Sequence, residues 1–352
     1  MKKGDPYGIH RVIEPKGTLP QPAEKINNDM SEIYDNEILI DVRTLNIDSA
    51  SFTNIYKEHS KMDLEKTKEI ICDIVNKQGK HMNPWTGSGG MLIGTVLQIG
   101  SVLEESIDLK VGDKIATLVS LSLTPLQIDE IIEIRPEMDQ VDIRGKAILF
   151  QSGIYSKIPD DMPEKLVLSV LDVAGAPAQS AKLSKKGMTV VVIGGTGKSG
   201  ILCLYEAKKN VGRDGKVICI GRNKNSIAKM KKLEDKGVCL ADEYICLDCT
   251  DAVSVMKAIG DVTDGQMADL VINTANVPNT EMASILSSKD EGIIYFFSMA
   301  TSFTKAALGA EGVGKDVNML IGNGYAKNHA QIALQIMRDC VPLRELYDEM
   351  YG

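Results

Sequence analysis

The second half of the chain alternates short apolar runs with longer amphipathic runs. From Met188 onward, most of the short runs are rich in Val and Ile, which is typical of buried strands. The segments between them carry apolar residues at helical spacing. This rhythm predicts an α/β domain in which a doubly wound parallel sheet has helices on both faces. The predicted strands are MTVVVIG, KVICIG, EYICL, DLVINTA and GIIYFFS.

The first half has a different texture. Residues 1–36 look irregular, residues 37–48 read as a strand, and residues 63–79 read as an amphipathic helix that ends at Gly79. From residue 91 to about residue 158, short strands are separated by turn residues. The pattern predicts a small barrel of antiparallel strands.

The pattern changes at Pro163, which places a domain boundary there. We expect a barrel-like catalytic domain over residues 1–162 and a dinucleotide-binding domain over residues 163–324. The C-terminal segment, about 325–352, is expected to return to the first domain.

The run VVVIGGTGKSG (190–200) contains two overlapping motifs. In the triphosphate loop G-x-x-x-x-G-K-S, the first glycine would fall on Val192, inside an apolar strand, so that motif is excluded. The same run fits G-x-G-x-x-G between a strand and a helix, which is the fingerprint of a Rossmann domain. In this interpretation Gly195 permits the tight turn, Gly197 lets a pyrophosphate approach, and Gly200 lets the helix pack on the strand. The predicted cofactor-binding residues of the turn are Gly195, Thr196, Gly197, Lys198, Ser199 and Gly200.

The end of the second strand bears on the choice of cofactor. An acidic residue there would bind the ribose 2′-hydroxyl of NAD, but the sequence has Arg222, Asn223 and Lys224. Arg222 and Lys224 suit a 2′-phosphate and favour NADP. In the alternative interpretation the cofactor is NAD, Arg222 stacks on the adenine, and Asn223 bonds the ribose. Both cofactors stay open at this point.

Composition and charge exclude several classes of partner. The 352 residues carry a formal net charge of −8, which argues against nucleic acid or an anionic membrane as the main partner. No apolar run approaches the roughly 20 residues of a membrane span, and the N-terminus does not read as a secretory signal. Seven cysteines, an odd number, are scattered along the chain. They are typical of free thiols in a reducing cytoplasm.

The cadence GTVLQIGSVLEESIDLKVGDKI (94–115) resembles the medium-chain dehydrogenase/reductase superfamily. That resemblance implies a GroES-like β-barrel catalytic domain before the Rossmann domain. Zinc members of the superfamily carry Cys and His-Glu at two points of the barrel, which correspond here to residues 45–55 and 86–94. Neither stretch contains Cys or His, so we expect no catalytic metal. The single pair Cys246 and Cys249 lacks a matching pair and is expected to be free thiols.

Four stretches together are similar to the L-erythro-3,5-diaminohexanoate dehydrogenase family of bacterial lysine fermentation, and length and domain order fit as well. The resemblance implies NAD-linked oxidative deamination of a small diamino acid, yielding 5-amino-3-oxohexanoate and ammonia in a fermenting cytoplasm. The stretches are HRVIEPKGTLPQPA (10–23), NPWTGSGGMLIGTV (83–96), LDVAGAPAQSAKL (171–183) and VVVIGGTGKSG (190–200).

Without a metal, proton transfer needs a base. Asp172 lies in an apolar helical segment, where it is either a base or ammonium ligand, or a capping or hinge residue. Glu311 follows the strand GIIYFFS and either binds a substrate ammonium or ends a solvated helix. His81, before the loop at 83–90, is either catalytic or structural. These three residues are the catalytic candidates, and their pocket is expected between the two domains.

The remaining candidates are polar residues expected near the substrate or the nicotinamide. Arg11 and Lys16 carry charges that suit a substrate carboxylate, or else they pair with surface acids. Thr86 and Ser88 either donate to the same carboxylate or form a turn. Residues that end later strands are expected on the nicotinamide half of the cofactor. They are Thr274, Asn276 and Ser298.

Two other classes of function stay open. A zinc-free NADPH-dependent quinone or enone reductase would share the fold and would need no carboxylate base. A redox-sensing protein that holds the cofactor without turnover is the non-enzymatic alternative. The resemblance to the superfamily also implies a homodimer, with residues 291–299 as the predicted edge strand.

Overall fold

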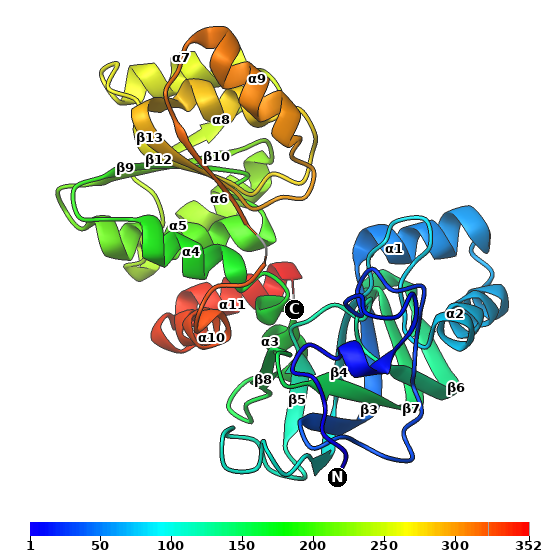
Figure 1. Ribbon diagram of the computed structural model, residues 1–352. Coiled ribbons are helices and arrows are strands. Elements are labelled where there is room, and N and C mark those ends of the chain that lie inside the picture. Colours follow the sequence, from blue (N-terminus) through cyan, green and yellow to red (C-terminus); the bar gives the residue numbers. More distant parts are fainter. Residues whose placement is uncertain (323, 352) are drawn as a thin grey trace. The chain divides into compact units, whose positions relative to one another are not determined.

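The structure, a computed structural model, describes residues 1–322 and 324–351, apart from the side chain of Ala50. The chain divides into two compact units, Met1–Asp160 and Asp161 onward. This division lies beside the boundary expected at residues 162 and 163. Figure 1 shows the elements of both units, and each unit is described here by itself.

The second unit is built on a six-stranded parallel sheet, as predicted. Its strand order is β11-β10-β9-β12-β13-β14, the order 3-2-1-4-5-6 of a doubly wound nucleotide-binding sheet. Residues 190–193 of the first strand are all β-branched and fully buried. This pattern is typical of a strand in a parallel sheet whose two faces are both covered. The strands are β9 (Thr189–Ile193), β10 (Lys216–Gly221), β11 (Glu243–Cys246), β12 (Ala268–Asn273), β13 (Ser288–Phe296) and β14 (Asn318–Ile321).

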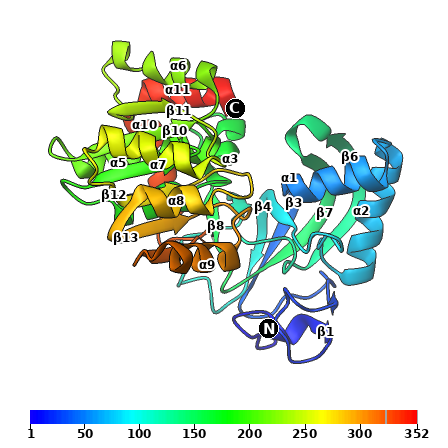
Figure 2. The same cartoon turned by 90° about the horizontal axis from the view of Figure 1, so that it is seen from above.

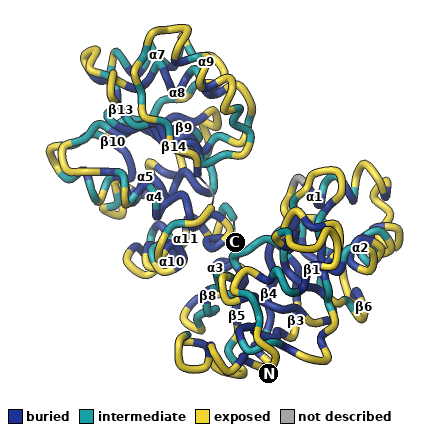
Figure 3. The backbone as a smooth tube through the Cα atoms, in the orientation of Figure 1, coloured by how far each residue is buried: buried dark blue, intermediate teal, exposed yellow. Residues whose placement is uncertain are grey.

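Helices cover both faces of this sheet, which confirms the predicted fold class (Figure 1). One face packs on α7 (Ala252–Val262), α8 (Glu281–Ser287) and α9 (Phe303–Val313) through a continuous apolar core. The other face packs on α5 (Lys198–Val211), which in turn lies against α4 (Gly175–Leu183). Figure 3 shows the resulting gradient, with dark blue central strands and yellow outer loops. α6 (Lys224–Lys231) flanks β11.

The last two helices belong to the second unit. The expected return of residues from about 325 to the first domain is not observed. Instead, α10 (His329–Asp339) and α11 (Val341–Tyr351) lie against α3 (Glu164–Leu171). α10 also packs on α4 and α5. Figure 2 shows α10 and α11 among the elements of the second unit. The apolar faces of both helices, with Leu343 and Tyr347 fully buried, explain this docking.

The edge strand also differs from the expected one. The predicted edge at residues 291–299 is β13, which pairs with β12 on one side and β14 on the other. β14 is therefore the strand at this end of the sheet.

The first unit holds a six-stranded antiparallel sheet in the order β6-β7-β3-β4-β5-β8. A helical layer packs on its apolar face and closes one core. That layer consists of α1 (Ser49–Thr53), a π-helical turn (Asn54–His59) and α2 (Leu64–Gln78). α2 begins at an Asp63 cap and ends at Gly79, whose φ of 75° requires glycine. The strands are β3 (Glu37–Ile47), β4 (Gly90–Ile99), β5 (Lys114–Thr117), β6 (Leu126–Arg135), β7 (Gln140–Phe150) and β8 (Tyr155–Lys157).

The N-terminal segment is fastened to this sheet by a buried ion pair. The segment forms β1 (Val12–Glu14) and β2 (Lys25–Ile26), which pair antiparallel. Arg11 donates from Nε and Nη2 to the two carboxylate oxygens of Glu37, each at 2.7 Å, and both residues are buried. Burial alone would raise the pKa of Glu37, but hydrogen bonds from Arg11, His10 and the Tyr34 N–H together lower it to about 2.

Replacing Arg11 with Met should strongly destabilise the first unit. The Glu37 carboxylate would stay buried without its bidentate partner, and breaking a buried pair in this way costs about 3–5 kcal/mol. Urea unfolding at pH 7 measures the loss. Trp85, the only tryptophan of the chain, belongs to this unit and reports its unfolding by fluorescence.

The matched control is Arg144→Met, which breaks an exposed pair with Glu130 at 2.8 Å and should cost about 1 kcal/mol or less. Because the pKa of Glu37 is lowered from 4.5 to about 2, its stabilisation is present above pH 4.5 and is lost as the pH falls toward 2. The Arg11 variant should lack most of this acid-dependent loss. Equal unfolding midpoints for the two variants at pH 7 would contradict the assignment.

Candidate functional site

The carboxyl ends of the parallel strands lie at one edge of the sheet, and most predicted cofactor residues directly follow these strand ends. The strand order reverses between β9 and β12, which defines the switch point where such sheets bind nucleotides. The turn after β9 lies on one side of this point. Thr274, which directly follows β12, lies on the other, and its hydroxyl donates to the Ile193 carbonyl at 3.0 Å. The sheet therefore places the glycine turn at the position that its topology predicts.

The turn itself has no room for side chains. Gly194 has a φ of 77°, and a Cβ on it would lie 2.7 Å from the Ala275 nitrogen. A Cβ on Gly200 would lie 2.3 Å from the Gly194 carbonyl oxygen. The first turn of α5 thus packs closely on the backbone of the turn itself at Gly200. The tight turn, however, belongs to Gly194 and not to Gly195, which was the predicted residue.

The first turn of α5 supplies the binding groups. Gly197 caps this helix, and the N–H groups of Lys198, Ser199 and Gly200 belong to the turn that a helix leaves without intrahelical acceptors. Together with the positive end of the helix dipole, they suit an anionic diphosphate. The cradle therefore fits a dinucleotide cofactor by its shape and by its donors.

The neighbouring strand is fitted closely to the same turn. A Cβ on Gly221, the last residue of β10, would lie 2.5 Å from the Thr196 hydroxyl oxygen and 2.6 Å from its methyl group. Gly221 was not among the predicted site residues, although it stands directly before Arg222 in the sequence. Its lack of a side chain lets Thr196 occupy its observed position.

A cavity of about 350 Å³ lies beyond the end of β10 and is lined by Arg222, Asn223, Lys224 and Asn225. Arg222 and Lys224 are exposed cations there. The Asn223 side chain caps α6, since its oxygen accepts from the N–H of Asn225 at 2.9 Å. The predicted residues of this corner are thus brought together, with the Asn223 oxygen already used inside the protein.

Asp172 and Lys198 form an ion pair beside the glycine turn. Lys198 Nζ lies 2.8 Å from Asp172 Oδ2, and the two side chains are 32% and 43% exposed. Asp172 ends α3, and Lys198 begins α5. The structure therefore brings one catalytic candidate into contact with a predicted cofactor residue.

Asn276 and Ser298 lie in the loops that follow β12 and β13. Asn276 is exposed, and Ser298 is half-buried with its hydroxyl accepting from the Ala300 N–H at 3.2 Å. Both belong to the same edge of the sheet as the glycine turn. The structure is consistent with their expected location at that edge.

Glu311 lies toward the opposite edge of the sheet. α9 begins after Ser302, near the carboxyl end of β13, and at 1.5 Å per residue Glu311 is about 13 Å further along. Lys315, just beyond the helix, donates to the carbonyl of Ser288, the first residue of β13. The structure contradicts the predicted role of Glu311, because an exposed carboxylate at this end does not reach the glycine turn.

In the first unit, three hydroxyl groups form a cluster. Ser51, from α1, is hydrogen-bonded to Thr86 and to Ser88, which come from the loop before β4. Asn83 holds the loop, since its side-chain nitrogen donates to the Ser51 carbonyl at 3.1 Å and its oxygen accepts from the Thr86 N–H. We call Ser51, Thr86 and Ser88 the hydroxyl cluster. Ser51 was missed, although it stands in the stretch 45–55 compared with the zinc-ligand positions.

The structure contradicts two other predictions in this unit and leaves a third without support. Arg11 is buried and its donors are taken by Glu37 and by the carbonyls of Asp29 and Glu32, so it is structural and not a substrate ligand. His81 is fully buried, and burial lowers its pKa to about 4, so it is a neutral core residue. Lys16 is exposed in the turn between β1 and β2.

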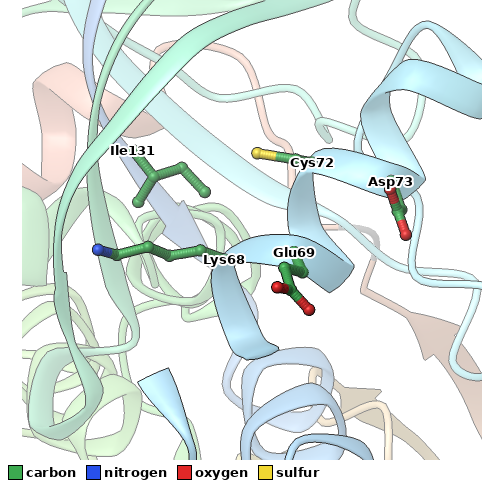
Figure 4. Close-up of a pocket in the computed structure, with 5 residues that line it drawn as sticks. All are labelled: Lys68, Glu69, Cys72, Asp73 and Ile131. Atoms are coloured by element: carbon green, nitrogen blue, oxygen red, sulfur yellow. The ribbon is translucent and has the colours of Figure 1, made fainter. Parts of the chain in front are cut away.

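Other features of the described residues add no catalytic group. A cavity of about 490 Å³ between α2 and β6, shown in Figure 4, is lined by Lys68, Glu69, Cys72, Asp73 and Ile131, none of them a predicted site residue. Within residues 1–322 and 324–351, no group of three or more His, Cys, Asp or Glu side chains could hold a metal ion. Over the same ranges, no helix combines the length and apolar character needed to cross a membrane.

The antiparallel unit followed by a doubly wound parallel sheet defines the class. It is the architecture of the medium-chain dehydrogenases and reductases. A solved alcohol dehydrogenase from Thermotoga maritima has the same fold, with a TM-score of 0.53 and 16% identity. The match covers 91% of this chain and 86% of that one.

Sequence comparison then identifies the family. The model of the L-erythro-3,5-diaminohexanoate dehydrogenase N-terminal domain matches residues 10–159. The L-erythro-3,5-diaminohexanoate dehydrogenase of Fusobacterium nucleatum is 59% identical over 351 residues, which is 100% of both chains. The protein of that name from Acetoanaerobium sticklandii is 58% identical over 349 residues, which is 99% of both chains. The chain belongs to the L-erythro-3,5-diaminohexanoate dehydrogenase family, which confirms the resemblance found in the sequence.

Replacing Gly221 with Ala should disturb the glycine turn. The new methyl group would overlap the Thr196 side chain, and overpacking of this kind costs about 1–3 kcal/mol. Thermal unfolding should show a lower midpoint. The matched control is Gly260→Ala in α7, where a Cβ meets no atom within 4 Å and alanine favours the helix. Equal unfolding midpoints for Gly221→Ala and Gly260→Ala would contradict the close fit of Gly221 against Thr196.

Proposed function

We propose that this chain catalyses the NAD-dependent oxidative deamination of L-erythro-3,5-diaminohexanoate to 5-amino-3-oxohexanoate and ammonia in lysine fermentation. The observation that carries the proposal is identity of 58–59% to two enzymes of that name over essentially the full length of each chain. The nucleotide-binding topology of the second unit supports the same class of reaction.

A nicotinamide cofactor would be held by the glycine turn and the first turn of α5. When bound, it supplies the acceptor for a hydride from the substrate carbon. The N–H groups of Lys198, Ser199 and Gly200 would bind its diphosphate. We propose NAD as the cofactor, with NADP also accepted, since the exposed cations Arg222 and Lys224 line the cavity beyond β10 and suit a 2′-phosphate.

Asp172 is the proposed base. The C3 ammonium of the substrate must lose a proton before hydride can leave that carbon, because the nitrogen lone pair drives its departure. Asp172 is half-exposed at the carboxyl edge of the sheet, whereas Glu311 is not near that edge. A diphosphate at the start of α5 would offer the Lys198 ammonium a second anionic partner. That exchange would free the Asp172 carboxylate to accept the proton.

The hydroxyl cluster is the proposed ligand of the substrate carboxylate. Thr86 is exposed and Ser88 is half-buried, so their hydroxyl groups can turn a proton toward an acceptor. The buried Ser51 hydroxyl and the Asn83 side chain hold the loop that presents them. Ser51, Thr86 and Ser88 come from the two stretches that carry the zinc ligands in the zinc-containing members of the superfamily. We infer that hydroxyl donors replace metal ligands there.

The proposed reaction balances without a metal or a further oxidant. The C3 ammonium gives one proton to Asp172, and C3 gives a hydride, which leaves an iminium ion. Water then adds to C3, and ammonia departs as the ammonium ion. In sum, one diamino acid, one oxidised nucleotide and one water become one oxo acid, one reduced nucleotide, one ammonium ion and one proton.

The assembly and compartment are proposed on separate grounds. β14 ends the sheet, and its residues Leu320 and Ile321 are 41% and 57% exposed, which supports a homodimer formed through this edge. All seven cysteines are free thiols, which supports a reducing cytoplasm.

The decisive assay mixes purified protein with 3,5-diaminohexanoate and either NAD or NADP. We expect the reduced nucleotide and ammonia to form in equal amounts, with a lower KM for NAD. Formation is followed by absorbance and by ammonia determination. A protein that reduces quinones or enones with NADPH and leaves the diamino acid untouched would be the alternative reductase. Binding of nucleotide without turnover of any of these substrates would favour the non-enzymatic alternative.

Changing Asp172 to Asn should lower kcat by about 10²-fold or more, the usual contribution of a general base. The matched control is Glu311→Gln, an exposed carboxylate of the same unit, which should leave kcat unchanged. A second outcome separates the two roles of Asp172. If only the KM for the nucleotide changes in Asp172→Asn, then Asp172 serves Lys198 and is not the base.

A further inference from the structure

The last helix of the described chain contacts the glycine turn directly. The Tyr351 hydroxyl, at the end of α11, donates to the Thr196 carbonyl oxygen at 2.9 Å. Thr196 stands between Gly195 and Gly197, so the contact falls inside the predicted fingerprint. None of the sequence motifs signals this contact, because 155 positions separate the two residues.

The bonded carbonyl belongs to a peptide group that is fixed at both ends. Its oxygen is that of Thr196 and its N–H is that of Gly197, which donates to the Gly194 carbonyl at 2.9 Å. A planar peptide held at both its acceptor and its donor cannot rotate without breaking one of the two bonds. The next residue is Lys198, where α5 begins. The orientation of this peptide therefore sets the direction in which the first-turn N–H groups point.

Tyr351 is itself held in place by α3. The Ser169 hydroxyl donates to the Tyr351 backbone carbonyl at 2.9 Å, and the Tyr347 hydroxyl donates to the Ser169 carbonyl at 3.3 Å. Tyr347 is fully buried, and its ring centroid lies 5.2 Å from that of Tyr351. We call Ser169, Tyr347 and Tyr351 the C-terminal clamp. Burial raises the pKa of Tyr351 to about 12, so its hydroxyl remains a donor over the pH range of an enzyme assay.

We propose that Tyr351 is a positioning residue of the nucleotide site, because its hydroxyl fixes the peptide between Thr196 and Gly197 for diphosphate binding. The proposal rests on the proposed function, since it needs the diphosphate to bind at this turn. Tyr351 acts through the peptide and not by touching the reacting atoms. Its loss should therefore weaken nucleotide binding and leave the chemical step unchanged.

The test is Tyr351→Phe in the full-length protein. Removing one neutral hydrogen bond should raise the Kd and the KM of NAD about three- to tenfold. The value of kcat and the KM of the diamino acid should stay as in the parent protein. Calorimetric titration with NAD gives Kd, and initial rates give the kinetic constants. The ratio of the two Kd values should be constant between pH 7 and pH 10, because the tyrosine does not ionise there.

Glu349→Gln is the matched control on the same helix. It breaks the ion pair between Glu349 and Lys229 of α6, at 2.8 Å, without touching Thr196, and should leave Kd unchanged. Equal NAD affinity in Tyr351→Phe and the parent would overturn the positioning role while the proposed function stands. An equal loss of affinity in Glu349→Gln would also overturn it, since helix docking alone would then explain the effect. A parent protein that binds neither NAD nor NADP would overturn the proposed function and this role together.

Discussion

The absence of side-chain volume at the turn between β9 and α5 is the constraint on which the site depends. A methyl group at Gly194 or Gly200 would overlap backbone atoms there, and one at Gly221 would overlap the Thr196 side chain. This closeness brings the start of α5 to the carboxyl edge of β9, at the point where the strand order reverses. A helix N-terminus in that position presents donors and a positive dipole end to an anion. This arrangement suits the diphosphate of a dinucleotide.

The strands of the second unit were predictable because their physics is local. A run such as Val190–Ile193, β-branched throughout, fits a strand buried on both faces, and the glycines after it identify the turn. Among the turn residues, the positive φ was assigned one position too late, to Gly195 in place of Gly194. Two consecutive glycines make the sequence ambiguous at this point. Only the contact with Ala275, from the loop after β12, decides between them.

The missed or misplaced site residues depend on contacts that the sequence does not show. In the sequence Arg11 has no evident partner, but in the fold Glu37 of β3 binds it. The role expected for Glu311 did not take into account that α9 runs back along the sheet, away from the glycine turn. His81 precedes a polar loop yet is fully buried. Ser51 lies 35 positions before Thr86, and only the fold makes them neighbours. Pairings over such separations are set by tertiary packing, which local patterns do not encode.

In the hydroxyl cluster, side-chain hydroxyl groups from two separate segments of the first unit lie within hydrogen-bond distance of one another. Ser51 lies in the stretch 45–55, and Thr86 and Ser88 lie in the stretch 86–94, where the resemblance to the superfamily would place zinc ligands. Hydroxyl groups neither bind zinc well nor bear a charge, but they donate hydrogen bonds. Such donors suit a substrate that brings its own carboxylate. An amine also needs less activation than an alcohol, because a nitrogen lone pair assists hydride departure once the proton is gone.

The hydrogen bond between Tyr351 and Thr196 has a consequence for how the protein matures on the ribosome. Thr196 is synthesised 155 positions before its partner, and at about 5–20 residues per second the interval is about 8–30 s. During that time the nascent sheet can form while the glycine turn lacks its tyrosine. A nucleotide that meets the turn before α11 has been synthesised would therefore meet it without the Tyr351 hydrogen bond.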